Sequence, residues 1–355
     1  MRAIQLAGAR QLELRELAEP PAPGPGEVLV EVLAVGICGS DLHMYETGEI
    51  GGLKSEEPFT LGHEFSARIV TTTEGAVDGT GRDLEPGQRV AVDPHVACGH
   101  CEQCREGNPN LCPHHYFFGV APTHGALCER MVVPAANCFL LPDSMSNAGG
   151  ALLEPMGVAL HSVNYSRLRP GDTVAVVGCG SIGILITRLA LLGGAARVLA
   201  FDRLPWRVEL ARKWGAEAHT VKGDEAVGIV GDLTRSRGVD VAVEAASADE
   251  SVGQCVDMAR YGGRVSLVGI SAANTFSMNP AVARRKGLTL RLIRRMKHTY
   301  PRCIRLASGQ QPKVPLDELV THVYPLERAA EAIDAAFEYR EGLIKAVVAL
   351  SRDRD

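Results

Sequence analysis

The sequence predicts an α/β fold in which a doubly wound parallel sheet is inserted into a second, mostly β domain. The chain has 355 residues, which suits two domains of about 150 residues each. Short β-like runs separated by Pro and Gly fill the first 150 residues, and from about residue 155 longer apolar runs alternate with helical stretches. Strands that alternate with helices indicate a parallel sheet covered on both faces.

The first part of the chain is expected to form an irregular β barrel or sandwich. Residues 19–26 are rich in Pro and Gly and make a connector that cannot continue a helix or a central strand. The β-like runs that follow are short and separated by turn residues, which is typical of such folds. The expected strands are 28–35, 65–70, 89–92 and 126–133.

The middle of the chain is expected to form the parallel sheet, with helices that include 181–193 and 205–214. Its expected strands are 174–177, 197–201, 218–221, 239–243, 264–268 and 288–292. Beyond residue 296 we expect one or two amphipathic helices and a last β-like run over 344–350. One of these helices has Ala329, Ile333, Ala336 and Phe337 on one face. This tail is too short for a domain of its own, so we expect it to return to the first domain.

Composition excludes several classes of protein. The net charge of −5 argues against a nucleic-acid-binding surface, which would need a basic patch. No stretch approaches the roughly 20 apolar residues of a membrane span, and no secretion signal is visible at the N-terminus. With 46% apolar and 22% charged residues, the chain is expected to be a cytoplasmic protein of enzyme size.

A glycine fingerprint follows one expected strand and opens an expected helix. Gly178 permits a tight turn, Gly180 lets a pyrophosphate approach the backbone, and Gly183 allows close packing of helix and strand. Asp202 comes nineteen residues after Gly183, close to the spacing of the acid that bonds a ribose hydroxyl. This acid favours NAD over NADP, although the adjacent Arg203 would soften that preference. The alternative is a purely structural glycine-rich turn that holds no ligand.

Four of the ten cysteines lie within 15 residues, namely Cys98, Cys101, Cys104 and Cys112. Four thiolates in a short loop make a closed tetrahedral site, which suits a structural zinc ion. The alternatives are an iron–sulfur cluster, whose last cysteine spacing does not match, and four free thiols. His100 lies inside this loop and is expected to be a surface residue.

A third group of residues is spread along the chain. It consists of Cys38 in the run Cys-Gly-Ser-Asp-Leu-His, then His63 and Glu64, then Glu154 before a proline. Each piece alone is more often a packed or solvated residue than a ligand. Together they supply a thiolate, an imidazole and two carboxylates, which are ligand types for a zinc site with an open position.

These motifs in combination resemble the zinc-containing medium-chain alcohol and polyol dehydrogenases, over essentially the whole chain. The resemblance implies a GroES-like catalytic domain over 1–156 and 296–355, with a structural zinc lobe at 95–115, and a Rossmann domain over 157–295. Glu154 stands where the alcohol dehydrogenases carry a second cysteine, which points to the branch of sorbitol and xylitol dehydrogenases. Runs at 45–50, 116–119 and 319–327 also resemble that branch.

The resemblance makes Cys38, His63 and Glu64 ligands of a catalytic zinc ion. Glu154 would be a fourth ligand or would hold the metal-bound water, and the sequence does not separate these roles. Adjacent side chains of a strand point to opposite faces. If His63 and Glu64 both face one metal, they must therefore lie at a turn or at a helix start.

The resemblance also assigns substrate and cofactor contacts. Ser40 would bond the substrate hydroxyl and His43 would relay its proton, while Phe118 and Arg295 would contact the substrate. Arg295 belongs to a basic run over 291–298 that is alternatively a solvated surface. The expected cofactor contacts are Gly178, Gly180, Ser181, Ile182, Gly183, Asp202 and Arg207.

The implied activity is reversible transfer of a hydride from a secondary hydroxyl of a polyol to NAD, with two zinc ions per chain. Met44 and Met296 stand where vertebrate-type sorbitol enzymes carry tyrosine, so the polyol contacts are altered. An L-threonine 3-dehydrogenase-like or other secondary-alcohol dehydrogenase is the alternative within the family. A zinc-ribbon nucleic-acid module and a zinc-free quinone or enoyl reductase are the alternatives outside it. The resemblance further implies a cytoplasmic homotetramer without nucleic-acid or membrane partners.

Overall fold

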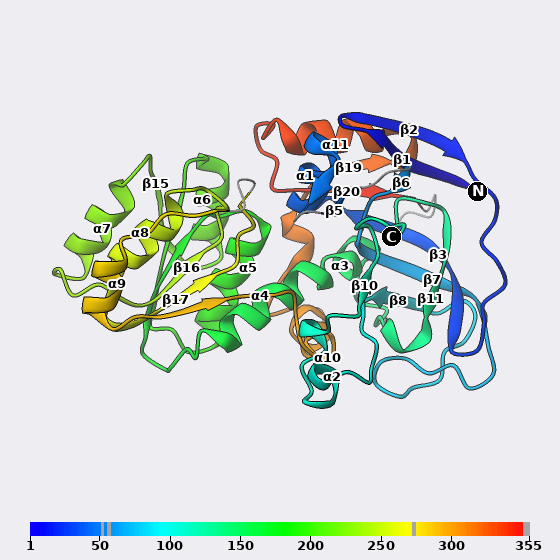
Figure 1. The fold of residues 1–355 in the computed structure, drawn as a ribbon, viewed down its shortest axis with the longest axis horizontal. Coiled ribbons are helices and arrows are strands. Elements are labelled where there is room, and N and C mark those ends of the chain that lie inside the picture. Colours follow the sequence, from blue (N-terminus) through cyan, green and yellow to red (C-terminus); the bar gives the residue numbers. More distant parts are fainter. Residues whose placement is uncertain (51–52, 55–57, 272–274, 351–355) are drawn as a thin grey trace. The chain divides into compact units, whose positions relative to one another are not determined.

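The computed structural model describes residues 1–50, 53–54, 58–271 and 275–350 (Figure 1). The chain divides into two compact units. Unit 1 comprises Met1–Glu154 and Lys297–Asp355, and unit 2 comprises Pro155–Met296. The junctions expected from the sequence fall after residues 156 and 295. Each unit is described by itself below.

Unit 1 is built on a seven-stranded sheet with the order β12-β8-β7-β3-β20-β19, to which β11 is added beside β3. The C-terminal strand β20 pairs antiparallel with the second half of β3, so the two ends of the chain share this sheet (Figure 1). Its strands are β3 Glu27–Gly36, β7 Glu64–Thr72, β8 Arg89–Val92, β11 Arg130–Pro134, β12 Cys138–Leu140, β19 Val320–Pro325 and β20 Lys345–Ala349.

Smaller elements complete unit 1. The strands β2, β1 and β6 form one small sheet, while β9 with β10 and β4 with β5 form two-stranded ladders. These strands are β1 Arg2–Gly8, β2 Gln11–Glu16, β4 Glu49–Ile50, β5 Leu53–Lys54, β6 Phe59–Thr60, β9 His95–Val96 and β10 Tyr116–Phe117. The helices are α1 Gly39–Thr47, α2 Glu102–Arg105, α3 Asn147–Ala151, α10 Tyr300–Ala307 and α11 Ala329–Phe337.

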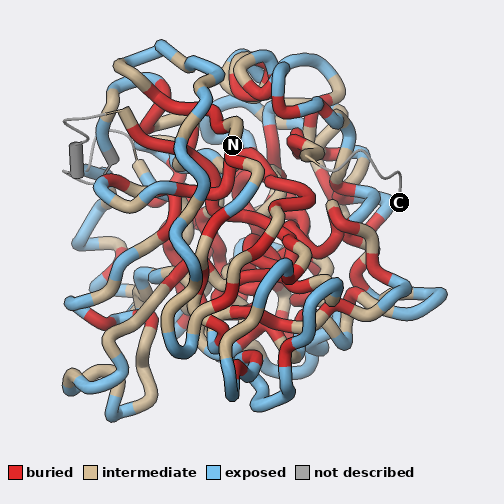
Figure 2. The backbone as a smooth tube through the Cα atoms, turned by 90° about the vertical axis from the view of Figure 1, so that its right-hand side faces the viewer, coloured by how far each residue is buried: buried red, intermediate tan, exposed pale blue. Residues whose placement is uncertain are grey.

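The core of unit 1 lies between these strands and α11. Val28, Val30 and Val32 alternate along β3 and are buried, together with Val35, among Phe65 and Ile69 of β7. Buried stretches of the backbone lie mostly in the interior and exposed stretches mostly at the periphery (Figure 2). The strand expected over 126–133 is wrong at its start, because only Arg130–Pro134 joins a ladder. Residues 126 and 127 instead bond the backbone of residues 61 and 62.

Unit 2 is a parallel sheet of six strands in the order β15-β14-β13-β16-β17-β18, flanked by helices. This confirms the expected doubly wound α/β fold. The strands are β13 Thr173–Val177, β14 Arg197–Asp202, β15 Glu217–Thr220, β16 Val239–Glu244, β17 Ala259–Leu267 and β18 Thr289–Leu292. The helices are α4 Leu153–Tyr165, whose first two residues belong to unit 1, α5 Ser181–Leu192, α6 Pro205–Lys213, α7 Glu225–Leu233, α8 Ser251–Met258 and α9 Pro280–Lys286.

The strand order reverses at β13, since the chain continues to β14 on one side of it and later to β16 on the other. Ligands of such sheets bind at the carboxyl ends of the strands beside this switch point. Of the helices that the structure describes, none combines the length and the apolar character that a membrane span requires.

Candidate functional site

Cys38 is the N-cap residue of helix α1, directly before its first residue, Gly39. The Asp41 carboxylate accepts a hydrogen bond from the Cys38 amide at 2.9 Å and another from the Gly62 amide at 3.3 Å. Asp41 therefore joins the start of the helix to the segment that carries the next candidate ligand. Ser40 and His43 are three residues apart on α1, which places them on the same side of the helix.

His63 and Glu64 lie where a turn enters β7. Gly62 has a φ of +93°, and a Cβ atom there would lie 2.9 Å from Val35. The backbone therefore turns at a residue that must be glycine. His63 follows this turn and precedes the strand, so the alternation of side chains along β7 does not set the direction of its side chain. Ligand atoms of Cys38, His63 and Glu64 all lie within 4.8 Å of one another. His63 therefore precedes β7 and Glu64 opens it, and the expectation that both side chains face one metal stays a prediction.

The His63 imidazole is buried between polar groups of α1 and one aromatic ring. Its Nε2 lies 3.3 Å from the Ser40 hydroxyl, and its Nδ1 lies 3.4 Å from an Asp41 oxygen. The Phe117 ring packs beside it with a centroid separation of 5.4 Å. Burial alone would lower the pKa of His63, but the charges of Asp41 and Cys38 outweigh burial and raise this pKa well above its usual value. The pocket thus favours a positive charge at this position.

Glu64 has a partner that sequence reasoning missed. The Lys345 ammonium of β20 donates to both Glu64 oxygens, at 2.9 and 2.8 Å, and to the Ile37 carbonyl oxygen at 2.9 Å. Burial would lower the pKa of Lys345, yet the Glu64 carboxylate outweighs it and raises this pKa. A lysine inside the apolar run 344–350 was the signal that a buried ion pair forms there.

Glu154 lies in the first turn of α4 and is buried. Burial raises the pKa of its carboxyl group to about 8, opposed by the charge of His63 and reinforced by that of Glu64. In the part of the chain that the structure describes, the ligand atoms of Cys38, His63 and Glu64 lie within 4.8 Å of one another, and the Glu154 oxygens do not belong to this cluster. Both carboxylates thus remain candidates for the position next to the metal.

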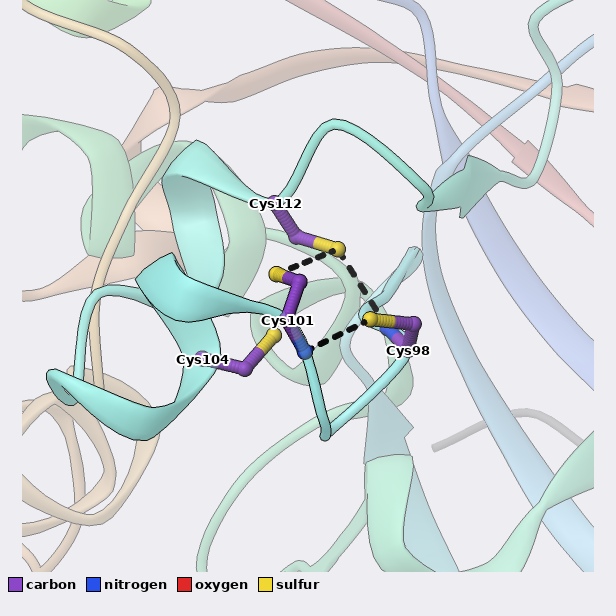
Figure 3. A group of neighbouring side chains, drawn as sticks. All are labelled: Cys98, Cys101, Cys104 and Cys112. Carbon is purple, nitrogen blue, oxygen red and sulfur yellow. Dashed lines mark hydrogen bonds between the residues drawn. The ribbon is translucent and has the colours of Figure 1, made fainter.

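The four clustered cysteines converge from a loop, the short helix α2 and the turn after it (Figure 3). Their sulfur atoms lie within 4.8 Å of one another, and the sulfurs of Cys101 and Cys112 are 3.8 Å apart. Four sulfurs at about 2.3 Å from a tetrahedral zinc ion would be separated by about 3.8 Å. The observed spacing therefore fits zinc. His100 is exposed, as expected.

The pKa values of two of these thiols are shifted in opposite directions. The His100 amide, together with further donors, lowers the pKa of Cys98 to about 6. Burial and the Cys101 thiol raise the pKa of Cys104 to about 12. Four neighbouring thiolates repel one another, so the complete set ionises only around a positive ion. The donor set fits a dication better than it fits four free thiols.

The glycine fingerprint adopts the conformation expected of a phosphate-binding turn. Gly178 has a φ of +95°, and a Cβ atom there would lie 2.7 Å from the backbone of Ala245 and Ala246. A Cβ atom on Gly183 would lie 1.8 Å from the Gly178 oxygen. Because these positions carry no side chain, the turn packs tightly and no Cβ atom covers the first amides of α5. This is the arrangement that binds a pyrophosphate.

Asp202 ends β14 beside this turn. Its two oxygens accept hydrogen bonds from the Cys179 amide at 2.7 Å and from the Leu204 amide at 2.9 Å. Arg207 of α6 lies 3.9 Å from one of these oxygens. Ser181 and Ile182 open α5 and are half-buried, and Arg203 is exposed. The expected cofactor residues Gly178, Gly180, Ser181, Ile182, Gly183, Asp202 and Arg207 thus all lie at the carboxyl ends of β13 and β14.

The residues expected to contact substrate do not lie together in one part of the structure, unlike the expected cofactor residues. Phe118 is buried and packs edge-on against Phe65, whereas the neighbouring Phe117 is the ring that lies against His63. The sequence interpretation therefore missed Phe117. Arg295 is half-buried near the end of unit 2, with a φ of +54°. Both Met44 and Met296 are buried.

Two family models match the chain. The alcohol dehydrogenase GroES-like domain matches residues 24–143, and the zinc-binding dehydrogenase model matches residues 181–309. A sorbitol dehydrogenase of Bacillus subtilis is 35% identical over 98% of this chain and 97% of its own. A D-xylulose reductase of Morganella morganii is 33% identical over 95% of this chain and 98% of its own.

Solved structures match over nearly the full length. An Escherichia coli oxidoreductase/dehydrogenase of unknown specificity has a TM-score of 0.91 at 29% identity, covering 99% of both chains. A Sinorhizobium meliloti protein bound to NADP has a TM-score of 0.86 at 30% identity, covering 98% of this chain and 99% of its own. An Escherichia coli alcohol dehydrogenase complexed with NADH has a TM-score of 0.86 at 28% identity, covering 99% of both chains.

Proposed function

Because the chain belongs to the zinc-containing medium-chain alcohol and polyol dehydrogenases, we propose that it transfers a hydride from a secondary hydroxyl of a polyol to NAD. The reaction is reversible and gives the ketose. The observation that carries this proposal is the convergence of Cys38, His63 and Glu64 beside the Ser40 hydroxyl. The sorbitol dehydrogenase and D-xylulose reductase names of two relatives support a sorbitol-like or xylitol-like substrate.

Cys38 and His63 hold the catalytic zinc ion in this proposal, together with Glu64 or Glu154. Zinc bound there supplies a Lewis acid that lowers the pKa of a substrate hydroxyl. The Asp41 oxygen near His63 Nδ1 orients the imidazole so that its Nε2 remains available. A second zinc ion belongs to Cys98, Cys101, Cys104 and Cys112, where four thiolates leave no position for substrate.

Ser40 and His43 carry the proton in this proposal. The Ser40 hydroxyl lies 3.3 Å from His63 Nε2, so it is within reach of a hydroxyl held beside that nitrogen. It accepts the substrate proton and donates its own toward His43 on the same side of α1. His43 is half-buried and passes the proton to solvent.

The cofactor in this proposal is NAD rather than NADP. The turn at Gly178 and the first amides of α5 hold the pyrophosphate, and Asp202 accepts hydrogen bonds from the ribose hydroxyls. A 2′-phosphate would bring negative charge against the Asp202 carboxylate. NAD held there would supply the acceptor for the hydride. We expect Asp202→Ala to weaken NAD use and to narrow the preference for NAD over NADP.

The remaining assignments follow the family. Arg295 is proposed as a substrate contact, and Phe118 stays a prediction that its packing against Phe65 does not support. We propose that 1–156 with 296–355 forms the catalytic domain and that 157–295 binds the cofactor. A cytoplasmic homotetramer without nucleic-acid or membrane partners completes the proposal, and light scattering tests the oligomeric state.

The test is a turnover assay on protein whose zinc content per chain has been counted. NADH absorbance is followed with sorbitol, xylitol, related polyols and L-threonine, using NAD and NADP in parallel. We expect turnover with at least one polyol and NAD, and two zinc ions per chain. Absence of turnover on every polyol by fully zinc-loaded protein would overturn the proposal. Faster turnover of threonine than of any polyol would reassign the substrate.

A further inference from the structure

Glu244, the last residue of β16, has a buried carboxylate that the proposed mechanism does not use. One oxygen accepts hydrogen bonds from the amides of Ala246 and Ser247, each at 2.7 Å, and from the Ser251 hydroxyl at 2.9 Å. The other oxygen accepts the Gly269 amide at 3.0 Å. Four donors thus converge on a single acid at the carboxyl edge of the sheet.

These hydrogen bonds join the segments that follow two neighbouring strands. Ala246 and Ser247 follow β16, whereas Gly269 follows β17. The Ser247 hydroxyl adds a second link, because it accepts the Ile270 amide at 3.1 Å. Ser247 has a φ of +60°, which is unfavourable for a residue with a side chain and persists here because its amide is held by Glu244. A Cβ atom on Gly269 would lie 2.5 Å from the Glu244 carboxylate.

The backbone held by Glu244 is also the wall of the glycine turn. A Cβ atom on Gly178 would lie 2.7 Å from the backbone of Ala245 and Ala246, and the Ala245 amide bonds the Val177 oxygen at 2.8 Å. In the sheet, β14 with Asp202 lies on one side of β13, and β16 with Glu244 lies on the other. Two buried acids therefore flank the turn on opposite sides.

We infer that Glu244 is a positioning residue for the nicotinamide half of the cofactor. This inference rests on the proposed function. A dinucleotide lies across the switch point of the sheet. Since Asp202 takes the adenosine half at β14, the other half extends over the ends of β16 and β17. Ala246, Ser247 and Ile270 are exposed there, and the hydrogen bonds of Glu244 fix the conformation of this segment. Glu244 acts through these amides and does not touch the reacting atoms.

Glu244→Gln tests the inference with little change in size. Whichever way the amide is turned, its NH₂ group faces at least one backbone N–H that the carboxylate now accepts. A lost hydrogen bond to a charged group corresponds to roughly a tenfold change in an equilibrium constant. We therefore expect the Kd of NADH to rise about tenfold, while the Kd of AMP changes by less than about twofold. AMP reports the adenosine half alone.

Asp240→Asn is the matched control, because Asp240 is a buried acid near the other end of the same strand. Its carboxylate accepts the Thr173 amide at 3.0 Å and two arginine side chains. We expect this control to lower the melting temperature without changing the ratio of NADH affinity to AMP affinity. Isothermal titration calorimetry on the zinc-loaded protein, with zinc counted in each variant, supplies both affinities.

The outcomes separate this inference from the function on which it rests. If the unmodified protein binds neither NADH nor NADPH, the proposed function fails. If it binds NADH and Glu244→Gln binds NADH equally well, or loses NADH and AMP affinity in parallel, the positioning role is wrong. If Glu244→Gln does not fold, Ser251→Ala carries the test, since it removes one of the four donors to the Glu244 carboxylate. We expect about threefold weaker NADH binding there with AMP unchanged, and equal NADH binding refutes the role.

Discussion

Replacing Lys345 by methionine removes the positive partner of a buried carboxylate. The exposed fractions of the Lys345 and Glu64 side chains are 3% and 1%, and Nζ lies 2.8 Å from the nearer Glu64 oxygen. Lys345 also donates to the Ile37 carbonyl, so the variant leaves an anion and a carbonyl oxygen without their donor. We expect Lys345→Met to destabilise unit 1 strongly.

The magnitude follows from the geometry of the pair. At 2.8 Å and an effective dielectric constant of about 20, the two charges attract each other by about 6 kcal/mol. In the intact pair, the cost of removing both ions from water cancels most of this attraction. The variant keeps the desolvation cost of Glu64 and loses the attraction. Breaking such a pair on one side costs about 3–5 kcal/mol. For a unit of this size that corresponds to a fall in Tm of roughly 6–20 °C.

Thermal and urea unfolding, followed by circular dichroism near pH 7.5 at equal zinc content, measures the effect. Lys345→Arg is the control that keeps the charge, and its loss should be smaller. The double variant Glu64→Gln, Lys345→Met should recover part of the stability, because it removes the isolated anion. A loss below about 1 kcal/mol in Lys345→Met would refute the reasoning, as would a double variant less stable than the single one.

Three further predictions concern the metal centres and the response to acid. Cys38→Ala should abolish turnover while NADH binding stays measurable by fluorescence; activity equal to that of the unmodified protein would remove Cys38 from the site. Cys104→Ser should lower both the zinc count and the Tm, since three thiolates leave the tetrahedral site incomplete; an unchanged count by plasma mass spectrometry would contradict a zinc site there. Burial would raise the pKa of Asp240, but hydrogen bonds from Arg237, the Thr173 amide and Arg260 outweigh burial and hold this pKa well below its usual range. A depressed carboxyl pKa contributes stability above the unfolded-state value near 4 that is lost as the pH falls below it. Asp240→Asn should therefore lose less stability than the unmodified protein between about pH 5 and pH 2, and parallel losses would count against this assignment.

The parallel strands could be predicted from the sequence because both of their faces are buried. The residues of β13 are almost all apolar, and those of β16 are apolar except for Asp240 and Glu244 near its two ends, so both strands stand out as short apolar runs. Strand β8 was predicted with its observed bounds, Arg89–Val92, for a related reason, since Val90, Ala91 and Val92 are all buried. The apolar pattern carries this information without any knowledge of neighbouring strands.

The elements that were not predicted have one solvent-facing side or little regular structure. The hairpin of β1 and β2 contains charged and half-exposed residues along β2, so no apolar run marks it. Helix α1 was not predicted because its nine residues have no clear apolar face. The residues at 126–128 are apolar, but this segment bonds the loop at 61 and 62 and the N-terminal strand, which only the tertiary structure specifies.

The features of the candidate site that are local in sequence could be predicted, whereas those that depend on the tertiary structure could not. The four cysteines and the glycine turn are local in sequence, so their spacing alone predicted that they converge. The ion pair of Glu64 with Lys345 joins residues 281 positions apart, and the ring beside His63 is Phe117 rather than its neighbour. Both depend on the pairing of strands and on side-chain direction in a short ladder. Spacing along the chain does not encode either.

Three glutamates show why residue type and motif do not by themselves assign a role. Glu64 lies against an ammonium group, Glu154 has a pKa raised to about 8 by burial, and Glu244 accepts three N–H groups and a hydroxyl. The first is neutralised by a partner, the second is favoured in its protonated form at neutral pH, and the third is satisfied by backbone donors. A carboxylate compensated by a lysine is a weaker competitor for a metal than its position suggests. A protonated one must first lose its proton to bind a metal. The choice of metal ligand between Glu64 and Glu154 is therefore a question of which of these two costs zinc overcomes, and the zinc affinities of Glu64→Gln and Glu154→Gln measure it directly.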